Sequence, residues 1–493
     1  MRRFFIQTFG CQMNVHDSRR IEEVLGARGY EATSDPSAAN LIVFNTCSVR
    51  EKADHKLHSA VGRYRELKEQ NADLVIAVAG CLAQQQGEAL LERMDLVDVV
   101  IGPDNIAELP DLVSEIEDGA PPLARTEFDL ESPSFLTAKV RPGEREVFSY
   151  VTVMKGCDER CTYCIVPYTR GSERYRSADE IVAEIATLCR GGVSEITLLG
   201  QTVNSWHEVG DIPAKQPAAL RGAASVGRKD ESRFPELLRR IAAEVPELRR
   251  IRYTSPHPRH VTPALIAAHA ELDVLPAHVH LPVQSGSDRV LRMMLRRYRR
   301  ADYIERAHAL QRSRPGFTLS TDMIVGFPGE TDADFEDTLS LVREVNFTSV
   351  FGFKYSPRPH TPALRLGDDI PEELKSERLT RLFALSDELQ QKHLNALVGS
   401  EAEVLIEGPS KAEGSPNRFS GRSERHEIIH VDAPPGVDLT GRMIPVRIVE
   451  AYKRSLLGAP LSPIVDIPAK QPSALRGDGP ADQRRVRLPV MVS

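Results

Sequence analysis

Residues 157–164 read Cys-Asp-Glu-Arg-Cys-Thr-Tyr-Cys and place three thiols, Cys157, Cys161 and Cys164, on one short stretch. This spacing lets a loop curl around a compact metal centre, and thiolates select soft metals, chiefly zinc and iron–sulfur clusters. A structural zinc site needs four protein ligands, but the next cysteine, Cys189, lies 25 residues further on. Cys189 ends a stretch with helical apolar spacing, so we interpret it as a core residue. Three ligands without a fourth favour a 4Fe–4S cluster with one iron open to a ligand.

The composition excludes several classes of protein. A length of 493 residues predicts about three domains at roughly 150 residues each. The net charge of -7 gives no global basic field, so any contact with nucleic acid must be local. Seven cysteines are too sparse for a disulfide scaffold. No apolar run approaches the roughly 18 residues of a membrane span, and the first residues turn polar too early for a signal peptide. We therefore expect a cytoplasmic protein that has no membrane contact.

Three other cysteines each come directly after an apolar run of strand character. The runs are residues 4–10, 41–46 and 74–80, and the cysteines that follow them are Cys11, Cys47 and Cys81. Helical stretches at residues 18–28 and 52–69 separate the runs, and this alternation predicts a parallel α/β sheet. Because the carboxyl ends of parallel strands share one edge, the three cysteines should converge there. The sequence therefore predicts a second iron–sulfur cluster held by three thiolates.

A second α/β region follows a linker at residues 117–146, which is rich in proline, glycine and charge. Its six strand-like runs are residues 147–154, 194–199, 250–254, 278–283, 318–325 and 349–355. The cysteine-rich loop follows the first run, at the face where barrel-like folds carry their chemistry. Polar residues and glycines follow the later runs and should meet at the same face; among them are Gly200, Gln201, Ser255, Gln284 and Gly326.

Two further regions bear on a nucleic-acid partner. Residues 289–300 hold six arginines and no acidic residue, a composition that suits contact with RNA. A solvated helix face paired with nearby carboxylates explains the same stretch equally well. After a helical stretch at residues 372–397, runs at residues 401–407, 426–432 and 443–450 predict a small antiparallel β-barrel, of the OB-like kind that can bind nucleic acid. The charges in this region nearly cancel, so a structural cap remains an alternative.

One segment occurs twice. Residues 211–222 return as residues 466–477 with only Ala218 changed, to Ser473. Proline and small residues dominate both copies, so neither should pack into a core. We expect the first copy to be an insertion in a mobile surface loop and the second to lie in a disordered tail, residues 461–493.

Longer motifs around these cysteines are similar to those of a known family. The cysteine-rich loop, with Tyr163 before its last cysteine, resembles that of the radical S-adenosylmethionine (SAM) enzymes, whose partial barrel has six β/α units. From residue 4 to about 461 the chain resembles the methylthiotransferase family, and within it the MiaB-type tRNA methylthiotransferases. The motifs that carry this resemblance are residues 8–14, 45–53, 80–84, 157–171, 199–205, 281–287 and 322–331.

The resemblance implies a fold of three parts. These are an N-terminal methylthiotransferase domain (residues 1–116), a radical SAM partial barrel (147–397) and a C-terminal TRAM domain (398–460). It implies two 4Fe–4S clusters, one held by Cys11, Cys47 and Cys81 and one held by Cys157, Cys161 and Cys164. The second of these trios is expected to be catalytic. It also implies a site for S-adenosylmethionine, for which we expect contacts from Tyr163, Gly200, Gln201, Ser255, Gln284, Asp322 and Gly326.

The activity implied is transfer of a methylthio group to C2 of N6-isopentenyladenosine beside the anticodon, at position 37 of tRNA. The C2–H bond has no acidic proton, so acid–base catalysis cannot open it whereas a radical can. The expected partners are the tRNA anticodon stem-loop and an electron donor such as a flavodoxin or ferredoxin, and the chain is expected to be a monomer.

Three alternatives are considered beside this activity. Sister enzymes that modify ribosomal protein S12 carry a Gly-Cys-Pro-Lys-Asn type motif, and those acting on threonylcarbamoyl-adenosine in tRNA usually carry Gly-Cys-Lys-Val-Asn. Residues 10–14 here read Gly-Cys-Gln-Met-Asn, which matches the isopentenyladenosine branch. The third alternative is a non-catalytic iron–sulfur or zinc protein that binds RNA. Open coordination positions favour an enzyme, since an electron carrier closes its clusters with four ligands.

Overall fold

The computed structural model describes residues 2–48, 52–129, 146–209, 232–412, 415–464 and 490–491. Both copies of the repeated segment, residues 211–222 and 466–477, lie outside the described residues, and so does most of the predicted tail. In the part of the chain that is described, no helix combines the length and apolar character needed to cross a membrane.

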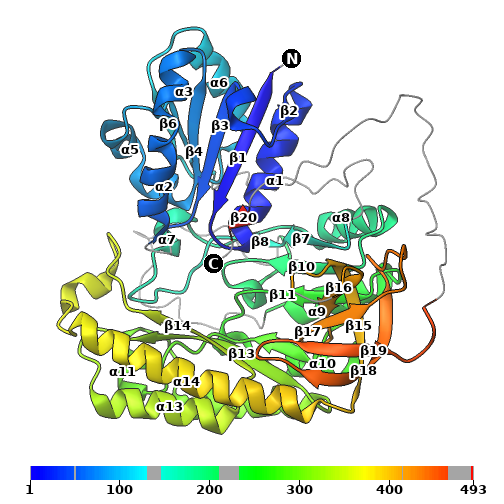
Figure 1. Ribbon diagram of the computed structural model, residues 1–493. Coiled ribbons are helices and arrows are strands. Elements are labelled where there is room, and N and C mark those ends of the chain that lie inside the picture. The colour runs from blue at the N-terminus through cyan, green and yellow to red at the C-terminus, as the bar shows by residue number, and fades with distance from the viewer. Residues whose placement is uncertain are drawn as a thin grey trace.

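The N-terminal part is a parallel sheet with helices on both faces (Figure 1). Its strands are β1 (Arg3–Phe9), β2 (Glu31–Ala32), β3 (Leu41–Thr46), β4 (Val75–Gly80), β5 (Val99–Ile101) and β6 (Leu123–Arg125), in the order β2-β1-β3-β4-β5-β6. Helices α1 (Gln12–Ala27) and α6 (Leu109–Glu117) pack on one face. Helices α2 (Lys52–Gly62), α4 (Cys81–Gln86) and α5 (Glu88–Arg93) pack on the other, and α3 (Arg65–Gln70) follows α2. Full burial of β3 and β4 explains their unbroken apolar runs.

Two strands lie where the sequence predicts irregular chain. β6 falls inside the predicted linker and pairs with β5, so the sheet extends further than expected. β20 (Val490–Met491) falls inside the predicted disordered tail and pairs with β1 through Thr8 and Phe9.

The central part has the six predicted strands, which fall in two parallel sheets of three. The first sheet has the order β11-β10-β7 and the second β12-β13-β14. These strands are β7 (Phe148–Thr152), β10 (Glu195–Leu199), β11 (Arg250–Tyr253), β12 (His278–His280), β13 (Thr318–Val325) and β14 (Ser349–Lys354). The helices are α7 (Val166–Thr169), α8 (Ala178–Arg190), α9 (Phe234–Glu244), α10 (Pro263–Glu271), α11 (Asp288–Met293), α12 (Arg300–Ser313) and α13 (Asp332–Val345). One apolar core joins the outer faces of both sheets to α8–α13, and Cys189 packs against it from α8, as predicted.

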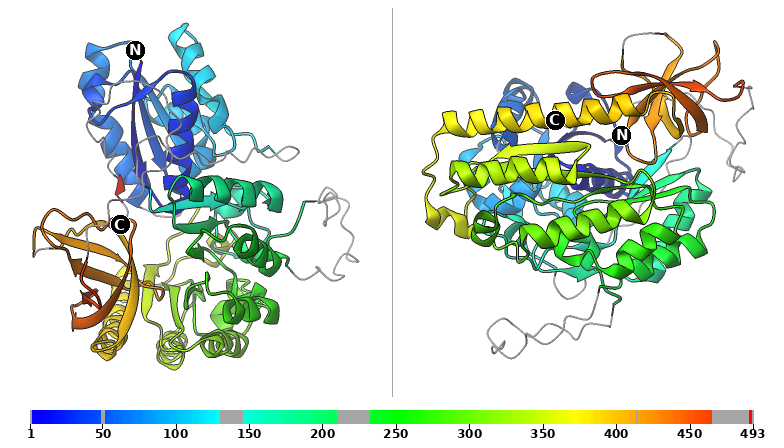
Figure 2. Two further views of the ribbon diagram at one scale, coloured as in Figure 1. Left: turned by 90° about the vertical axis from the view of Figure 1, so that its right-hand side faces the viewer. Right: turned by 90° about the horizontal axis from the view of Figure 1, so that it is seen from below.

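The C-terminal part is a closed barrel of five strands, reached through the long helix α14 (Glu372–Ala396). Its strands are β15 (Glu401–Pro409), β16 (Arg418–Arg422), β17 (Ile428–Asp432), β18 (Met443–Ala451) and β19 (Leu456–Pro460). The prediction of a small β-barrel is confirmed, with two strands more than the sequence indicated. Figure 2 shows this barrel beside the central part, with α14 running along β14.

The N-terminal sheet stands on the central part with its strand C-termini facing the junction (Figure 1). Short elements of the central part lie there: α7 and the hairpin of β8 (Met154–Lys155) and β9 (Arg174–Tyr175). Buried polar contacts tie the two parts together. Lys155 and Arg174 both bond Asp104, and the Thr152 hydroxyl contacts the ring of His16.

Candidate active site

The three N-terminal cysteines meet at the edge of the sheet that faces the junction. Phe9, Thr46 and Gly80 are register partners across β1, β3 and β4, so the residues that follow them come out side by side. Cys47 follows β3, Cys81 opens α4, and Cys11 is the N-cap of α1. The carboxyl ends of parallel strands thus bring together three thiols that are far apart in the sequence.

Tight packing at this edge requires glycine at two positions. A Cβ on Gly10 would lie 2.3 Å from the side-chain oxygen of Asn14 and 2.9 Å from the Cβ of Cys47. Gly80 has a φ of +94°, in the region that favours glycine, and its Cβ would lie 2.4 Å from the side-chain oxygen of Asn45. Asn14 donates from its amide to Asn45 (3.0 Å), which fixes the start of α1 against the end of β3.

The electrostatics of these thiols differ from one another. A hydrogen bond with Cys47 lowers the pKa of Cys11 to about 6, against the effect of burial, with help from Asn14 and Arg170. Burial raises the pKa of Cys81, and the guanidinium of Arg170 partly offsets this rise. Arg170 Nε donates to Cys81 Sγ over 3.2 Å. One thiol is therefore poised as a thiolate, and a fixed positive charge faces another.

Arg170 also joins the two cysteine trios. It directly follows α7, a helix of four residues and so about 6 Å long, which begins two residues after Cys164. Besides Cys81, Arg170 bonds Asp17 of α1 through Nη2 (2.6 Å). Burial would raise the pKa of Asp17, but Arg170 and His16 bring it down to about 2. The loop that carries one trio is thereby fixed directly against the other trio.

The loop of Cys157, Cys161 and Cys164 is held from several sides. Cys157 Sγ lies 2.8 Å from the Thr202 hydroxyl, and Arg296 Nη1 donates to Cys161 Sγ over 3.3 Å. Burial and the neighbouring Cys161 raise the pKa of Cys164 to about 12. Burial and the neighbouring Cys164 likewise raise the pKa of Cys157. Ionising these thiols therefore needs a strong positive partner such as a metal centre.

Backbone contacts fix the conformation of this loop. Gly156 has a φ of +78°, and a Cβ there would lie 2.0 Å from the carbonyl oxygen of Ser172. Thr162 donates its backbone N–H to Met294 O (3.1 Å) and its hydroxyl to Met293 O (2.9 Å). The loop is thus docked on the end of α11.

Both trios fit a multinuclear cluster better than a single metal ion. In the described part of the chain, only Glu159, His257 and His260 place three ligand atoms within 4.8 Å of one another. The sulfurs of each trio are therefore spread more widely than that. A zinc ion bound at about 2.3 Å would bring tetrahedral sulfurs to about 3.8 Å from each other. The wide, all-thiolate donor sets suit iron–sulfur clusters.

Two predicted contacts with S-adenosylmethionine lie next to the cysteine loop. Gln201 accepts a hydrogen bond from the backbone N–H of Gly156 (2.5 Å), while its amide nitrogen is buried without a protein partner. Tyr163 packs beside the apolar cluster that contains Val290 and Phe327. The unpaired amide of Gln201 is a polar group that a bound ligand could satisfy.

The other predicted contacts lie around the strand ends. Ser255 and Gln284 have φ values of +58° and +78°, uncommon for residues other than glycine and a form of strain found at ligand sites. Asp322 carries its carboxylate 3.5 Å from His280 Nε2. Gly200 is packed against Met154. Gly326 differs from these residues. Its N–H donates to the carboxylate of Glu330, and a Cβ at this position would lie 2.4 Å from the side chain of Lys375, so packing explains the glycine.

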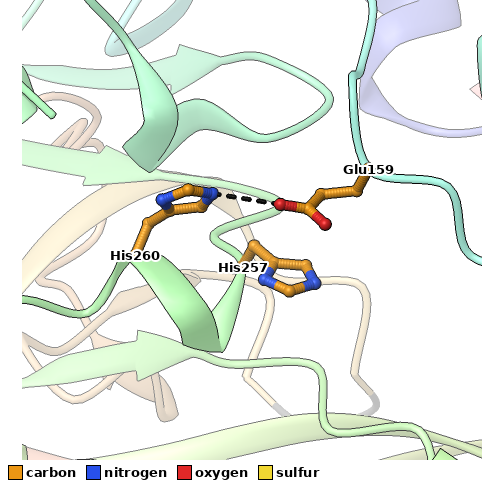
Figure 3. A group of neighbouring side chains, drawn as sticks. All are labelled: Glu159, His257 and His260. Atoms are coloured by element: carbon orange, nitrogen blue, oxygen red, sulfur yellow. Dashed lines mark hydrogen bonds and ion pairs between the residues drawn. The ribbon is translucent and has the colours of Figure 1, made fainter. Parts of the chain in front are cut away.

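A buried carboxylate inside the cysteine loop forms a charge cluster that the sequence analysis missed. Glu159 contacts His260 (3.2 Å), Arg259 (3.4 Å) and Arg297 (3.8 Å), with His257 beside them (Figure 3). Burial would raise the pKa of Glu159, but His260 and the two guanidiniums bring it down to about 2. The guanidiniums of Arg259 and Arg297 already neutralise Glu159 and disfavour a metal ion. We therefore interpret the cluster as a clamp that ties the loop to η5 (Pro258–His260).

Removing the charge of Glu159 is expected to loosen the cysteine loop. Hydrogen bonds to charged groups contribute about 1.5–3 kcal/mol, so Glu159→Gln should speed amide exchange at residues 157–165 roughly 10-fold or more. Hydrogen exchange of the metal-free full chain, read by mass spectrometry, measures this. Glu305→Gln, at an exposed position of α12, is the control. Unchanged exchange in Glu159→Gln would contradict the clamp.

Two arginines of the site, Arg170 and Arg296, were not identified from the sequence as site residues. Each is fully buried and donates to one sulfur of a different trio. Within the arginine-rich stretch, Arg289 and Arg300 pair with Asp334 and Glu344, so for them the interpretation as a charge-paired helix face holds. Periodicity gives no signal that would separate Arg296 from its neighbours.

Comparison with known proteins agrees with this architecture. A family model described as "Uncharacterized protein family UPF0004" matches residues 3–102, and one described as "Radical SAM superfamily" matches residues 151–342. The tRNA-2-methylthio-N(6)-dimethylallyladenosine synthase of Sorangium cellulosum (strain So ce56) is 57% identical over 468 residues, covering 92% of this chain and 93% of that protein.

Solved structures show the same fold at low sequence identity. The radical S-adenosylmethionine methyltransferase TsrM from Kitasatospora setae, with tryptophan and a SAM analogue bound, is 13% identical with a TM-score of 0.52, covering 84% of this chain and 79% of TsrM. TsrM with cobalamin and a [4Fe-4S] cluster bound gives a TM-score of 0.51 at 13% identity, covering 85% and 81%. Together with the extensive identity to the synthase, the two matched domains show that this chain belongs to the radical SAM family of tRNA methylthiotransferases.

Proposed function

We propose that this enzyme transfers a methylthio group to C2 of N6-isopentenyladenosine beside the anticodon of tRNA. The observation that carries the proposal is the pair of three-thiol sites, joined through α7 and Arg170, in a chain 57% identical to a synthase named for this product. One site would generate the radical and the other would carry the sulfur, so both should lie next to one substrate. The division at residues 1–116, 147–397 and 398–460 is part of the proposal, as is a cytoplasmic location, where tRNA is found.

The chain's own residues would hold and insulate the reacting groups. When bound, the cluster on Cys157, Cys161 and Cys164 would supply the electron that cleaves S-adenosylmethionine. The cluster on the N-terminal trio would carry the sulfur that is transferred, and a second S-adenosylmethionine would supply its methyl group. Cys157, Cys161, Cys47 and Cys81 are buried, and Cys11 and Cys164 are partly buried, which would limit the access of water to both sites.

Other side chains would position the ligand and the sulfur donor. The free amide of Gln201 and the strained backbone at Ser255 offer polar contacts to S-adenosylmethionine. Arg170 would keep the second cluster in register with the first, since it bonds Cys81 and follows the loop that ends at Cys164.

The partners follow from the chemistry. The tRNA anticodon stem-loop supplies the nucleoside, and a flavodoxin or ferredoxin would supply electrons. The monomer is expected to be the active form, because all six cluster ligands lie on one chain.

A reconstitution experiment tests the proposal. The full chain, loaded anaerobically with iron and sulfide, is given S-adenosylmethionine, dithionite and an anticodon stem-loop that carries N6-isopentenyladenosine. We expect 5′-deoxyadenosine and the 2-methylthio nucleoside by mass spectrometry. Stem-loops with unmodified adenosine or threonylcarbamoyl-adenosine should yield little product. Release of 5′-deoxyadenosine without any methylthio product on all three RNAs would refute the proposed reaction.

A further inference from the structure

Two phenylalanines on β14 turn exposed rings toward the inside of the partial barrel. Phe351 is 50% exposed and Phe353 is 44% exposed, although each lies in a strand of the central sheet. Val350, between Ser349 and Phe351 on the same strand, is buried in the core that the helices cover. Because side chains alternate along a strand, Phe351 and Phe353 face away from that core.

The register shows what shares this inner face. Phe351 pairs with Asp322 of β13, and Phe353 pairs with Ile324, so their side chains lie on one side of the sheet. His280 of β12 reaches the same face, because its ring packs edge-on against Phe351 at 5.6 Å and contacts Asp322. His280 and Asp322 are themselves 27% and 30% exposed. An aromatic wall and a polar pair therefore stand side by side and open to a ligand.

This wall lies below the cysteine loop. Ile324, the register partner of Phe353, packs beside the cluster of Val290, Phe327 and Tyr355 that Tyr163 also contacts. Phe351 lies two residues before Phe353 on β14 and is therefore further from the cysteine loop. The other end of the barrel interior is filled by the turn between β16 and β17. His426 of that turn stacks on His278 at 5.5 Å, and Arg252 donates to Ser423 O over 2.8 Å. A ligand on the wall would therefore enter from the side of the cysteine loop.

We propose that Phe351, with His280 and Asp322, forms the pocket wall that receives the target purine base of the RNA. The inference rests on the proposed function and deepens it by assigning residues that hold the base. An enzyme that reacts at C2 must take the base out of the anticodon-loop stack. A flipped base is held by stacking on aromatic rings and by hydrogen bonds at its edges. Phe351 supplies the ring and the Asp322 carboxylate supplies an acceptor. His280 orients that carboxylate, because its Nδ1 contacts the Ser320 hydroxyl (3.0 Å) and its Nε2 faces Asp322.

A double-mutant cycle with RNA tests this wall. The loaded full chain is titrated with two fluorescein-labelled anticodon stem-loops, one with N6-isopentenyladenosine and one abasic at the target position, and anisotropy gives Kd. Stacking on one aromatic ring contributes roughly 1–3 kcal/mol per base. Phe351→Ala should therefore reduce the affinity ratio between the two RNAs about 10-fold, and Phe351→Tyr should keep the wild-type ratio.

A matched control uses an aromatic ring of helix α14 that packs against the opposite face of β14. Phe383 of α14 is 41% exposed and lies next to Gly352, on the side away from the barrel interior. Phe383→Ala should keep the wild-type affinity ratio. The Kd for S-adenosylmethionine and the release of 5′-deoxyadenosine without RNA should stay within twofold in Phe351→Ala. Circular dichroism checks that each variant is folded.

The outcomes separate this inference from the proposed reaction. A change of less than twofold in the affinity ratio, while the wild type still makes the methylthio product, would overturn the assignment of Phe351. A selective loss of S-adenosylmethionine binding would also overturn it, because the ring would then hold the adenine of that ligand. Release of 5′-deoxyadenosine by the wild type without the methylthio product refutes the proposed reaction instead, whatever the cycle shows.

Discussion

Replacing Cys47 by alanine should abolish methylthio transfer while S-adenosylmethionine cleavage continues. Cys47 is 2% exposed and its side chain contacts Cys11 at the end of β3. Without it the N-terminal trio would keep two thiolates, too few to hold the proposed second cluster, which we expect to have three protein ligands. The loop of Cys157 is untouched, so its chemistry should persist. Iron should fall from about eight to about four atoms per chain, as expected for the loss of one of two 4Fe–4S clusters.

Two further variants serve as controls for this experiment. Cys161→Ala should remove both 5′-deoxyadenosine and the methylthio nucleoside, because both depend on the other trio. Cys189→Ala on α8 should leave iron, cleavage and transfer unchanged, since Cys189 packs against the apolar core. Iron and product are measured on the same anaerobic preparations. Retention of about eight irons in Cys47→Ala, or loss of S-adenosylmethionine cleavage together with transfer, would contradict two independent three-thiolate sites.

The sequence predicted elements best where burial alone decides the pattern. β3 and β4 are buried along their whole length, and their apolar runs were predicted to within one residue. The three-residue β5 and β6 gave no such signal, because strands that short show no period. β16 was missed because its residues are largely polar. Its Gly421 is needed where a Cβ would lie 2.0 Å from Leu405 O, a contact that no local pattern reveals.

The predicted start of a helix was wrong where its polar residues make buried contacts with neighbouring elements. The sequence predicts a helix from residue 18, but α1 begins at Gln12. Its first turns carry Asn14, His16 and Asp17, which hide the apolar period because they bond Asn45, Thr152 and Arg170. The predicted helix at residues 52–69 is likewise divided, since α2 ends at Gly62 and α3 starts at Arg65.

The same limit applies to the candidate site. Thiols that follow strands could be placed at one edge from topology alone, because parallel strands end together. Arg170 and Arg296 could not be found this way, since nothing local separates them from surface arginines. Phe351 was hidden for the opposite reason: an aromatic residue in a strand predicts core, and only the register with Asp322 shows that it faces the barrel interior.

Replacing Arg170 by methionine should release the N-terminal part from the central part. Arg170 and Asp17 are 4% and 8% exposed, and the variant leaves the Asp17 carboxylate buried without its cation. Breaking a buried pair by removing one partner costs about 3–5 kcal/mol, most of it from the uncompensated charge. Arg170→Met should therefore lower the urea midpoint of the metal-free full chain and speed amide exchange in α1 and α7. Asp17→Asn/Arg170→Met should recover most of the loss, because no charge remains unpaired. A double variant as unstable as Arg170→Met would show that the guanidinium acts through Cys81 instead, and the ion pair would not be what joins the two trios.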